Sequence, residues 1–119
     1  MFKRITLASL ALVLIGTTAA SAWTRIRTEA EFRAQIVGRN TVIEGRGGTV
    51  QHADGTVTGT WDGQVVRGRW SWSDGLYCRN LNIGGRVTGT DCLEYFIDGN
   101  RIRAVRDYGR GAEIFSTIE

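Results

Sequence analysis

Residues 76–93 read LYCRNLNIGGRVTGTDCL and contain both cysteines of the chain. Two segments that suit a pleated surface flank a Gly-Gly pair, which accepts the positive φ values of a tight hairpin turn. In a hairpin centred on Gly85, Cys78 lies directly opposite Cys92. Opposed Cα atoms of a non-hydrogen-bonded antiparallel pair are ~4.5 Å apart, close enough for a disulfide. The stretch therefore predicts a β-hairpin stapled by a Cys78–Cys92 bond.

The same register places apolar and oppositely charged residues opposite one another. It pairs Arg79 with Asp91, Tyr77 with Leu93 and Ile83 with Val87, and leaves Gly84-Gly85-Arg86 as a three-residue loop. Cross-strand pairs of these kinds stabilise an antiparallel ladder. A disulfide that closes a loop of about 15 residues stabilises a fold by ~3 kcal/mol. The cysteines are interpreted as structural, because a redox pair typically has CxxC spacing.

Turn signals outside this hairpin continue the pattern. Asp-Gly pairs occur at 54–55, 62–63, 74–75 and 98–99, and a further Gly-Gly pair occurs at 47–48. The chain has no proline to interrupt a ladder. Strands are predicted at 41–46, 49–53, 56–61, 64–73, 76–83, 87–97, 100–107 and 112–118. These elements predict a mainly β fold, an antiparallel meander of about 7–8 strands that forms a small barrel or a strongly curled sheet.

One short helix is predicted ahead of the strands. Thr28-Glu29-Ala30-Glu31 has the form of a capping box, in which the threonine hydroxyl and the second glutamate satisfy each other's backbone N–H groups. Phe32 and Ile36 are four residues apart and share one face. Gly38 is a typical C-terminal stop. A helix of about ten residues is expected.

Alternation along the predicted strands assigns their faces. In 64–73, the side chains of Trp70 and Trp72 point one way and those of Arg67 and Arg69 the other. The residues expected in the core are Trp61, Trp70, Trp72, Phe96, Ile102 and Ile114, with Phe32 and Ile36 of the helix closing one side or end.

The first 22 residues have the organisation of a secretory signal peptide. Lys3 and Arg4 precede a mostly apolar run, and Ala20-Ser21-Ala22 matches the small-x-small pattern of a cleavage site. The run is about half of the roughly 20 apolar residues that a membrane-spanning helix needs. We therefore expect cleavage after Ala22, one domain over 23–119, no membrane span after cleavage, and a periplasmic or secreted protein.

Cleavage leaves a nearly neutral chain. Residues 23–119 contain thirteen arginines and twelve acidic residues, a net charge of +1. Nucleic-acid-binding domains carry a marked basic excess on one face. The charge balance argues against a nucleic-acid partner.

Few residues have the chemistry of an active site or a metal centre. His52 is the only histidine, and with both cysteines oxidised too few ligands remain for a zinc ion, which takes three or four. The sequence has no GxSxG elbow, P-loop or GxGxxG motif. We therefore expect no catalytic residue, no metal and no cofactor.

Glu94 and Asp107 provide an alternative. Alternation places Glu94 on the face of Cys92 and Phe96, and if this face is buried the carboxylate needs a partner, which Arg106 could supply. A structural ion pair is the favoured interpretation. A small enzyme that uses Glu94 or Asp107 with an arginine stays open as the alternative.

The tryptophans indicate either a packed core or a binding cavity. Trp61, Trp70 and Trp72 are large enough to fill a small domain or to line a cavity for a small apolar ligand. If a ligand binds, the predicted contact residues are Trp70, Trp72, Tyr77 and Arg79.

The second half of the chain resembles a known group of proteins. Residues 68–79 read GRWSWSDGLYCR, and Asp91-Cys92 and Asp107-Tyr108-Gly109-Arg110-Gly111 follow. They match the pattern GxWxWxxGxYCR, then DC, then DxGxG, of small exported proteobacterial proteins. The resemblance implies a periplasmic β-rich domain with a disulfide between Cys78 and Cys92. Members of the group are sometimes labelled dihydrodipicolinate reductase, but this chain lacks the nucleotide-binding motif of such an enzyme.

A shorter stretch, 53–61, is similar to a strand–turn segment of avidin-type barrels and suggests a barrel.

Taken together, the sequence predicts an exported, non-enzymatic domain that binds a small ligand or an envelope protein. The other alternative is an inhibitor or structural protein that acts through an exposed sheet edge.

Overall fold

The structure, a computed structural model, describes residue 11 and residues 22–119. Apart from Ala11 and Ala22, the predicted signal peptide lies outside the described residues. The elements are β1 (Thr24–Ile26), α1 (Glu29–Gln35), β2 (Asn40–Ile43), β3 (Gly47–Gln51), β4 (Thr56–Trp61), β5 (Gln64–Ser73), β6 (Leu76–Ile83), β7 (Arg86–Asp98), β8 (Arg101–Val105), α2 (Arg106–Gly109) and β9 (Glu113–Ile118). In the described part of the chain, no helix is long and apolar enough to cross a membrane.

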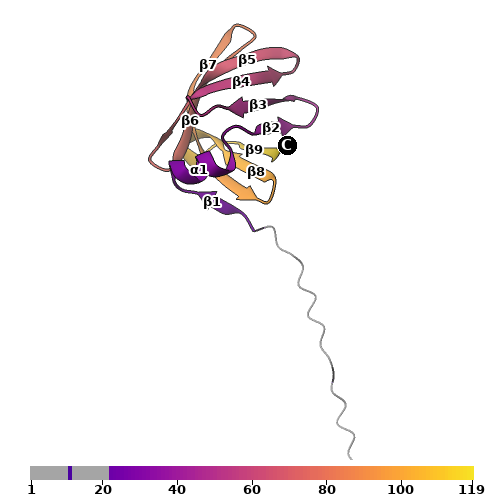
Figure 1. The fold of residues 1–119 in the computed structure, drawn as a ribbon, viewed down its shortest axis with the longest axis vertical. Helices are drawn as coiled ribbons and strands as arrows, with labels where there is room; N and C mark the ends of the chain where they lie inside the picture. Colours follow the sequence, from indigo (N-terminus) through magenta and orange to yellow (C-terminus); the bar gives the residue numbers. More distant parts are fainter. Residues whose placement is uncertain (1–10, 12–21) are drawn as a thin grey trace, which may run out of the picture.

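Eight strands close into an antiparallel barrel (Figure 1). From β2 to β9 each strand pairs with the next one along the chain, and β9 pairs back with β2. β1 is an additional strand that pairs with the last part of β7, beyond the residues that β6 covers. The predicted mainly β meander is confirmed, and it forms a closed barrel rather than a curled sheet.

The helix begins at the predicted cap. The Thr28 hydroxyl accepts a hydrogen bond from the N–H of Glu31 (3.2 Å). The Glu31 carboxylate accepts from the N–H of Arg27 (3.3 Å) instead of that of Thr28. α1 is seven residues long, shorter than expected, because the chain turns away at Ile36 to enter β2.

α1 lies at the end of the barrel beside β1 (Figure 1) and closes it. Phe32 and Ile36 are fully buried there. The Phe32 ring lies 5.1 Å from the rings of Trp70 and Tyr77, 5.3 Å from that of Trp72 and 5.5 Å from that of Tyr95. This aromatic cluster forms the floor of the barrel interior.

The central hairpin of β6 and β7 carries the predicted disulfide. Cys78 pairs with Cys92 across the strands, with Cα atoms 4.0 Å apart and a bond between the sulfur atoms. The predicted neighbours, Tyr77 with Leu93 and Arg79 with Asp91, are also paired. Since Tyr77 and Leu93 point into the barrel, the disulfide faces outward.

The register shifts near the tip of this hairpin. Asn80 pairs with Thr90 but Asn82 pairs with Val87, so the predicted pair of Ile83 with Val87 is wrong and Ile83 faces Arg86. The turn is the two residues Gly84-Gly85, not three. The cause is a β-bulge at Thr88-Gly89, where Gly89 has φ +77° and the Thr88 hydroxyl accepts from the N–H of Leu81 (3.1 Å).

Two predicted core residues lie elsewhere. Phe96 is on the outer face of β7, where the Arg103 guanidinium lies 4.8 Å from its ring, because β7 positions that alternate with Leu93 and Tyr95 point outward. Trp61 is only partly buried, and it lines a cavity at the end of the barrel opposite α1. Trp70, Ile102, Phe32 and Ile36 are core residues, and Trp72 and Ile114 pack against them.

Candidate ligand-binding cavity

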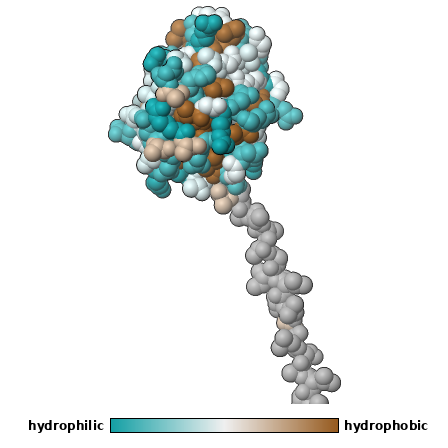
Figure 2. All heavy atoms as spheres, viewed as in Figure 1, coloured by the Kyte–Doolittle hydropathy of each residue, from teal (hydrophilic) through white to brown (hydrophobic). Residues whose placement is uncertain are grey.

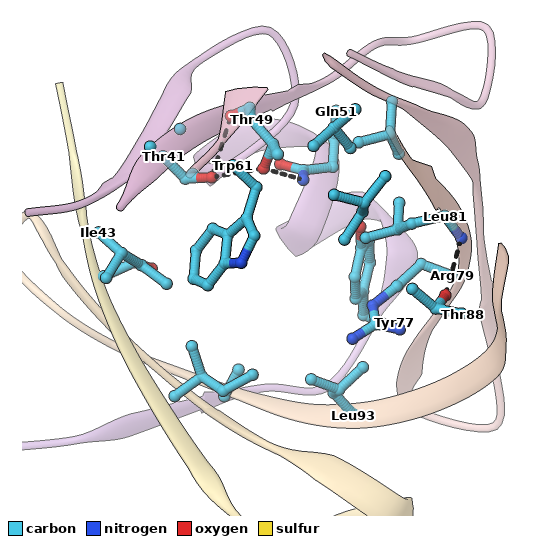
Figure 3. A pocket seen from close by; sticks show the side chains of 18 of the residues that line it. Thr41, Ile43, Thr49, Gln51, Trp61, Tyr77, Arg79, Leu81, Thr88 and Leu93 are labelled. Atoms are coloured by element: carbon cyan, nitrogen blue, oxygen red, sulfur yellow. Dashed lines mark hydrogen bonds between the residues drawn. The ribbon is translucent and has the colours of Figure 1, made fainter. Parts of the chain in front are cut away.

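The barrel contains a partly open cavity of about 370 Å³, and Figure 3 shows the side chains that line it. The open end, called the mouth, lies between the β2–β3, β4–β5 and β6–β7 turns, opposite α1. An eight-stranded barrel is just wide enough inside to be filled by side chains or to hold one small ligand. The volume falls within the range of ~300–1,000 Å³ that small-molecule pockets occupy.

Small inward-facing residues leave this space unfilled. Ala104 and Ser116 line the cavity from β8 and β9. On β4, Gly59 alternates with the inward-facing Val57 and Trp61, and a side chain at Gly59 would collide with the carbonyl oxygen of Gly48. The barrel wall is therefore tightly curved and thin on this side, and the interior stays open.

The part of the cavity nearest α1, called the deep half, has a polar wall on β2 and β3. The Thr41 hydroxyl donates to the carbonyl oxygen of Thr49 (3.0 Å) and lies 3.3 Å from the Thr49 hydroxyl. The Gln51 amide nitrogen donates to the Thr49 hydroxyl (3.2 Å). Gln51 is 3% exposed, and its Oε1 atom has no hydrogen-bond partner among the described residues. A buried carbonyl oxygen of this kind needs a donor.

Two tyrosines face the deep half from β6 and β7. Burial raises the pKa of Tyr77 far above its ordinary value, and the neighbouring Tyr95 adds to this effect, while Gln51 and the positive charge of Arg79 oppose it. Burial raises the pKa of Tyr95 to about 12, and Arg79 again acts in the opposite direction. Both hydroxyl groups are therefore protonated at neutral pH and can donate hydrogen bonds.

The raised pKa values predict alkaline destabilisation. The folded protein holds the Tyr95 proton up to about pH 12, whereas the unfolded chain releases it near pH 10. The stabilising contribution is thus complete below pH 10 and is lost as the pH rises towards 12, by up to ~1.4 kcal/mol per pH unit for each tyrosine. Tyr77 acts in the same direction, so Tyr95→Phe should roughly halve the slope. Urea unfolding of the wild type and of Tyr95→Phe between pH 9 and 11.5 measures how the free energy of unfolding falls with pH. Equal slopes for the two proteins would show that Tyr95 does not contribute to the alkaline destabilisation.

Arg79 points into the cavity beside Tyr77 (Figure 3). Asp91 lies opposite it on β7, but the Asp91 carboxylate is bound elsewhere. It accepts from Nε of Arg106 (2.8 Å) and from the N–H of Asp107 (3.1 Å). Burial alone would raise the pKa of Asp91, but these hydrogen bonds and the charges of Arg106 and Arg79 hold it below its usual value. Among the described residues, no ion pair involves Arg79.

A left-handed turn brings Arg106 to the cavity. Asp107, Tyr108 and Gly109 all have positive φ, at 52°, 57° and 85°. Such a conformation is costly for residues other than glycine and persists only where the surroundings hold it. The Asp91 carboxylate does so by binding both Arg106 and the N–H of Asp107.

The mouth is apolar, in contrast to the deep half. Its walls include Ile43 from β2, Trp61 from β4, and Leu81 and Ile83 from β6. The Arg46 guanidinium lies 4.7 Å from the Trp61 ring and is held by both oxygens of Asp62, at 2.8 and 3.0 Å. These contacts fix Trp61 at the rim of the cavity.

The four predicted contact residues separate into two pairs. Tyr77 and Arg79 line the cavity. Trp70 and Trp72 lie in the floor, packed on Phe32, and Trp70 donates its indole N–H to the carbonyl oxygen of His52 (2.8 Å). The two tryptophans therefore do not line the cavity, because Phe32 of α1 covers them on the inner face of β5.

The residues of the enzymatic alternative lie outside the cavity. Glu94 is on the outer face of β7 and is 3.9 Å from Arg25, so the predicted pairing with Arg106 is wrong. Asp107 is exposed, with Arg110 at 3.7 Å. His52 contacts the Thr58 hydroxyl at 2.7 Å. In the described part of the chain, no group of His, Cys, Asp and Glu could hold a metal ion.

The face of the molecule in Figure 2 is mainly hydrophilic, with hydrophobic residues visible between hydrophilic ones. The large hydrophobic residues exposed among the described residues are Val65, Val87, Tyr108 and Phe115. Single exposed apolar side chains of this kind are common on monomeric proteins, so the cavity is the better candidate site.

Fold and site together define a small antiparallel β-barrel that is closed at one end by a helix and contains a half-polar, half-apolar cavity. No protein-family model, curated protein or solved structure matches the chain. The resemblances noted from the sequence stay predictions, and the function has to be argued from the cavity itself.

Proposed function

We propose that this protein binds one small, largely apolar molecule inside its barrel, and that it does so outside the cytosol. The observation that carries the proposal is the open cavity of about 370 Å³, with apolar walls at the mouth and hydrogen-bonding groups in the deep half. This combination is typical of small-molecule sites, in which apolar contacts supply affinity and a few polar groups fix the orientation. The signal-like N-terminus and the disulfide support export.

A larger side chain at an inward-facing position of β9 should fill the cavity and leave the pairing of the barrel strands intact. Ser116 lines the cavity from β9, and the next residue, Thr117, points outward. We expect Ser116→Phe to place a ring in the cavity and to weaken binding of a neutral apolar probe roughly ten-fold or more, which corresponds to ~1.4 kcal/mol. Thr117→Phe is the matched control and should bind like the wild type.

Titration with N-phenyl-1-naphthylamine, a neutral dye that fluoresces in apolar surroundings, measures this binding. The wild type and Thr117→Phe should saturate at one dye per chain. Circular dichroism and the melting temperature verify that Ser116→Phe is folded. Absence of dye binding to the wild type, or equal binding by the two variants, would overturn the proposal.

A further inference from the structure

The cavity is polar at its closed end and apolar at its mouth. Along β6 the inward residues from floor to mouth are Tyr77, Arg79, Leu81 and Ile83. Opposite them, Gln51, Thr49 and Thr41 line the deep half, whereas Ile43 and Trp61 line the mouth. A ligand that matches these walls has its polar group deep in the barrel and its apolar part at the opening.

The charge around the cavity is net positive. The charged residues that line the cavity are Arg79 and Arg106, and none of the described acidic residues lines it. Arg106 is neutralised by Asp91, at 2.8 Å. Asp91 also lies opposite Arg79 on β7, so one carboxylate faces two guanidinium groups, and among the described residues no ion pair involves Arg79. Burying a charge is costly unless it is paired, and guanidinium and carboxylate form strong charge-assisted hydrogen bonds.

A second, independent feature lies nearby in the deep half. The Oε1 atom of Gln51 is buried and has no hydrogen-bond partner among the described residues. The hydroxyl groups of Tyr77 and Tyr95 also line the cavity and can donate hydrogen bonds to a ligand. A group that both accepts hydrogen bonds and carries a donor, such as a carboxylate with a neighbouring hydroxyl, would satisfy Arg79 and Gln51 together.

We infer that the ligand is a small amphipathic monoanion, such as a medium-chain carboxylic acid with a hydroxyl beside its carboxylate, which binds with its anionic group at Arg79 and its apolar chain towards the mouth. The inference rests on the proposed function, since it specifies the occupant of the same cavity. Because the mouth is open, a chain longer than the cavity extends into solvent and does not abolish binding.

Displacement of bound N-phenyl-1-naphthylamine tests the charge. Decanoate should displace the dye from the wild type at a roughly ten-fold lower concentration than 1-decanol, a neutral molecule of the same chain length. Arg79→Met should abolish this preference while it still binds the dye. Arg67→Met is the matched control, because Arg67 is an exposed arginine on the outer face of β5, and it should keep the preference.

The outcomes separate the two proposals. If the wild type binds the dye but does not prefer decanoate, or if Arg79→Met retains the preference, the anionic ligand is excluded and the cavity function stands. If the wild type does not bind the dye, the function itself fails.

Bromine, which quenches tryptophan fluorescence on contact, tests the orientation. In the inferred pose, 10-bromodecanoate brings its bromine to Trp61 at the mouth, whereas 2-bromodecanoate keeps its bromine in the deep half. We therefore expect a component of quenching by 10-bromodecanoate that disappears in Trp61→Phe. If instead Trp61→Phe removes quenching by 2-bromodecanoate and not quenching by 10-bromodecanoate, the carboxylate end lies at the mouth. That result would overturn this part of the inference.

Discussion

Phe32→Ala is expected to lower the free energy of unfolding by about 3–5 kcal/mol, the usual cost of removing a buried aromatic ring. Phe32 is fully buried and contacts four other aromatic rings at 5.1–5.5 Å. Aromatic pairs add stability beyond the area they bury, and five rings leave little freedom for the floor to collapse around a missing one.

Urea denaturation, followed by circular dichroism, measures this loss. Phe115→Ala is the control, because Phe115 is 49% exposed on the outer face of β9, and its loss should cost under about 1 kcal/mol. Similar costs for the two variants would mean that α1 does not seal the barrel. If Phe32→Ala cannot be purified, Phe32→Leu, which keeps part of the buried volume, should show a smaller loss in the same direction.

Removal of the disulfide is the second large effect. The bond joins residues 14 positions apart, and the corresponding loop predicts a loss of ~3 kcal/mol in Cys78→Ala/Cys92→Ala. For a domain of this size each kcal/mol lowers the melting temperature by about 4–8 °C, so a decrease of roughly 12–24 °C is expected. The bond also fixes the strands that present Tyr77 and Arg79 to the cavity.

A reducing agent provides the internal control. It should lower the melting temperature of the wild type towards that of the double variant and leave the double variant unchanged. A double variant that melts within a few degrees of the oxidised wild type would show that β6 and β7 are held by their ladder and side-chain packing alone.

The strand order followed from local signals in the sequence. Asp-Gly and Gly-Gly pairs mark turns because few other residues accept positive φ, and alternation fixes which side chains share a face. The cysteines then fixed the register of β6 with β7. The register failed only beyond Asn80, because the bulge at Thr88-Gly89 depends on a hydrogen bond from Leu81 to Thr88, which no period-two pattern reveals.

The site was harder to predict than the fold. Alternation places a tryptophan on the inner face but does not distinguish a floor position, such as Trp70, from a rim position, such as Trp61. That distinction depends on where α1 packs, which is a long-range property. Gln51 gave no signal, because the predicted strand 49–53 contains other polar residues, Thr49 and His52, that are indistinguishable from it by pattern. Arg106 was assigned to the end of a strand because the left-handed turn after it has glycine only at its third residue.

The central claim is that the barrel interior is a binding site, and methyl NMR spectra recorded during a decanoate titration test it most directly. The account predicts saturable shifts at methyl groups that line the cavity, among them those of Ile43, Leu81, Leu93 and Ile114, while the exposed Val65 and Val87 stay unperturbed. Shifts confined to Val65 and Val87, or no saturable shift at the lining methyl groups, would contradict it.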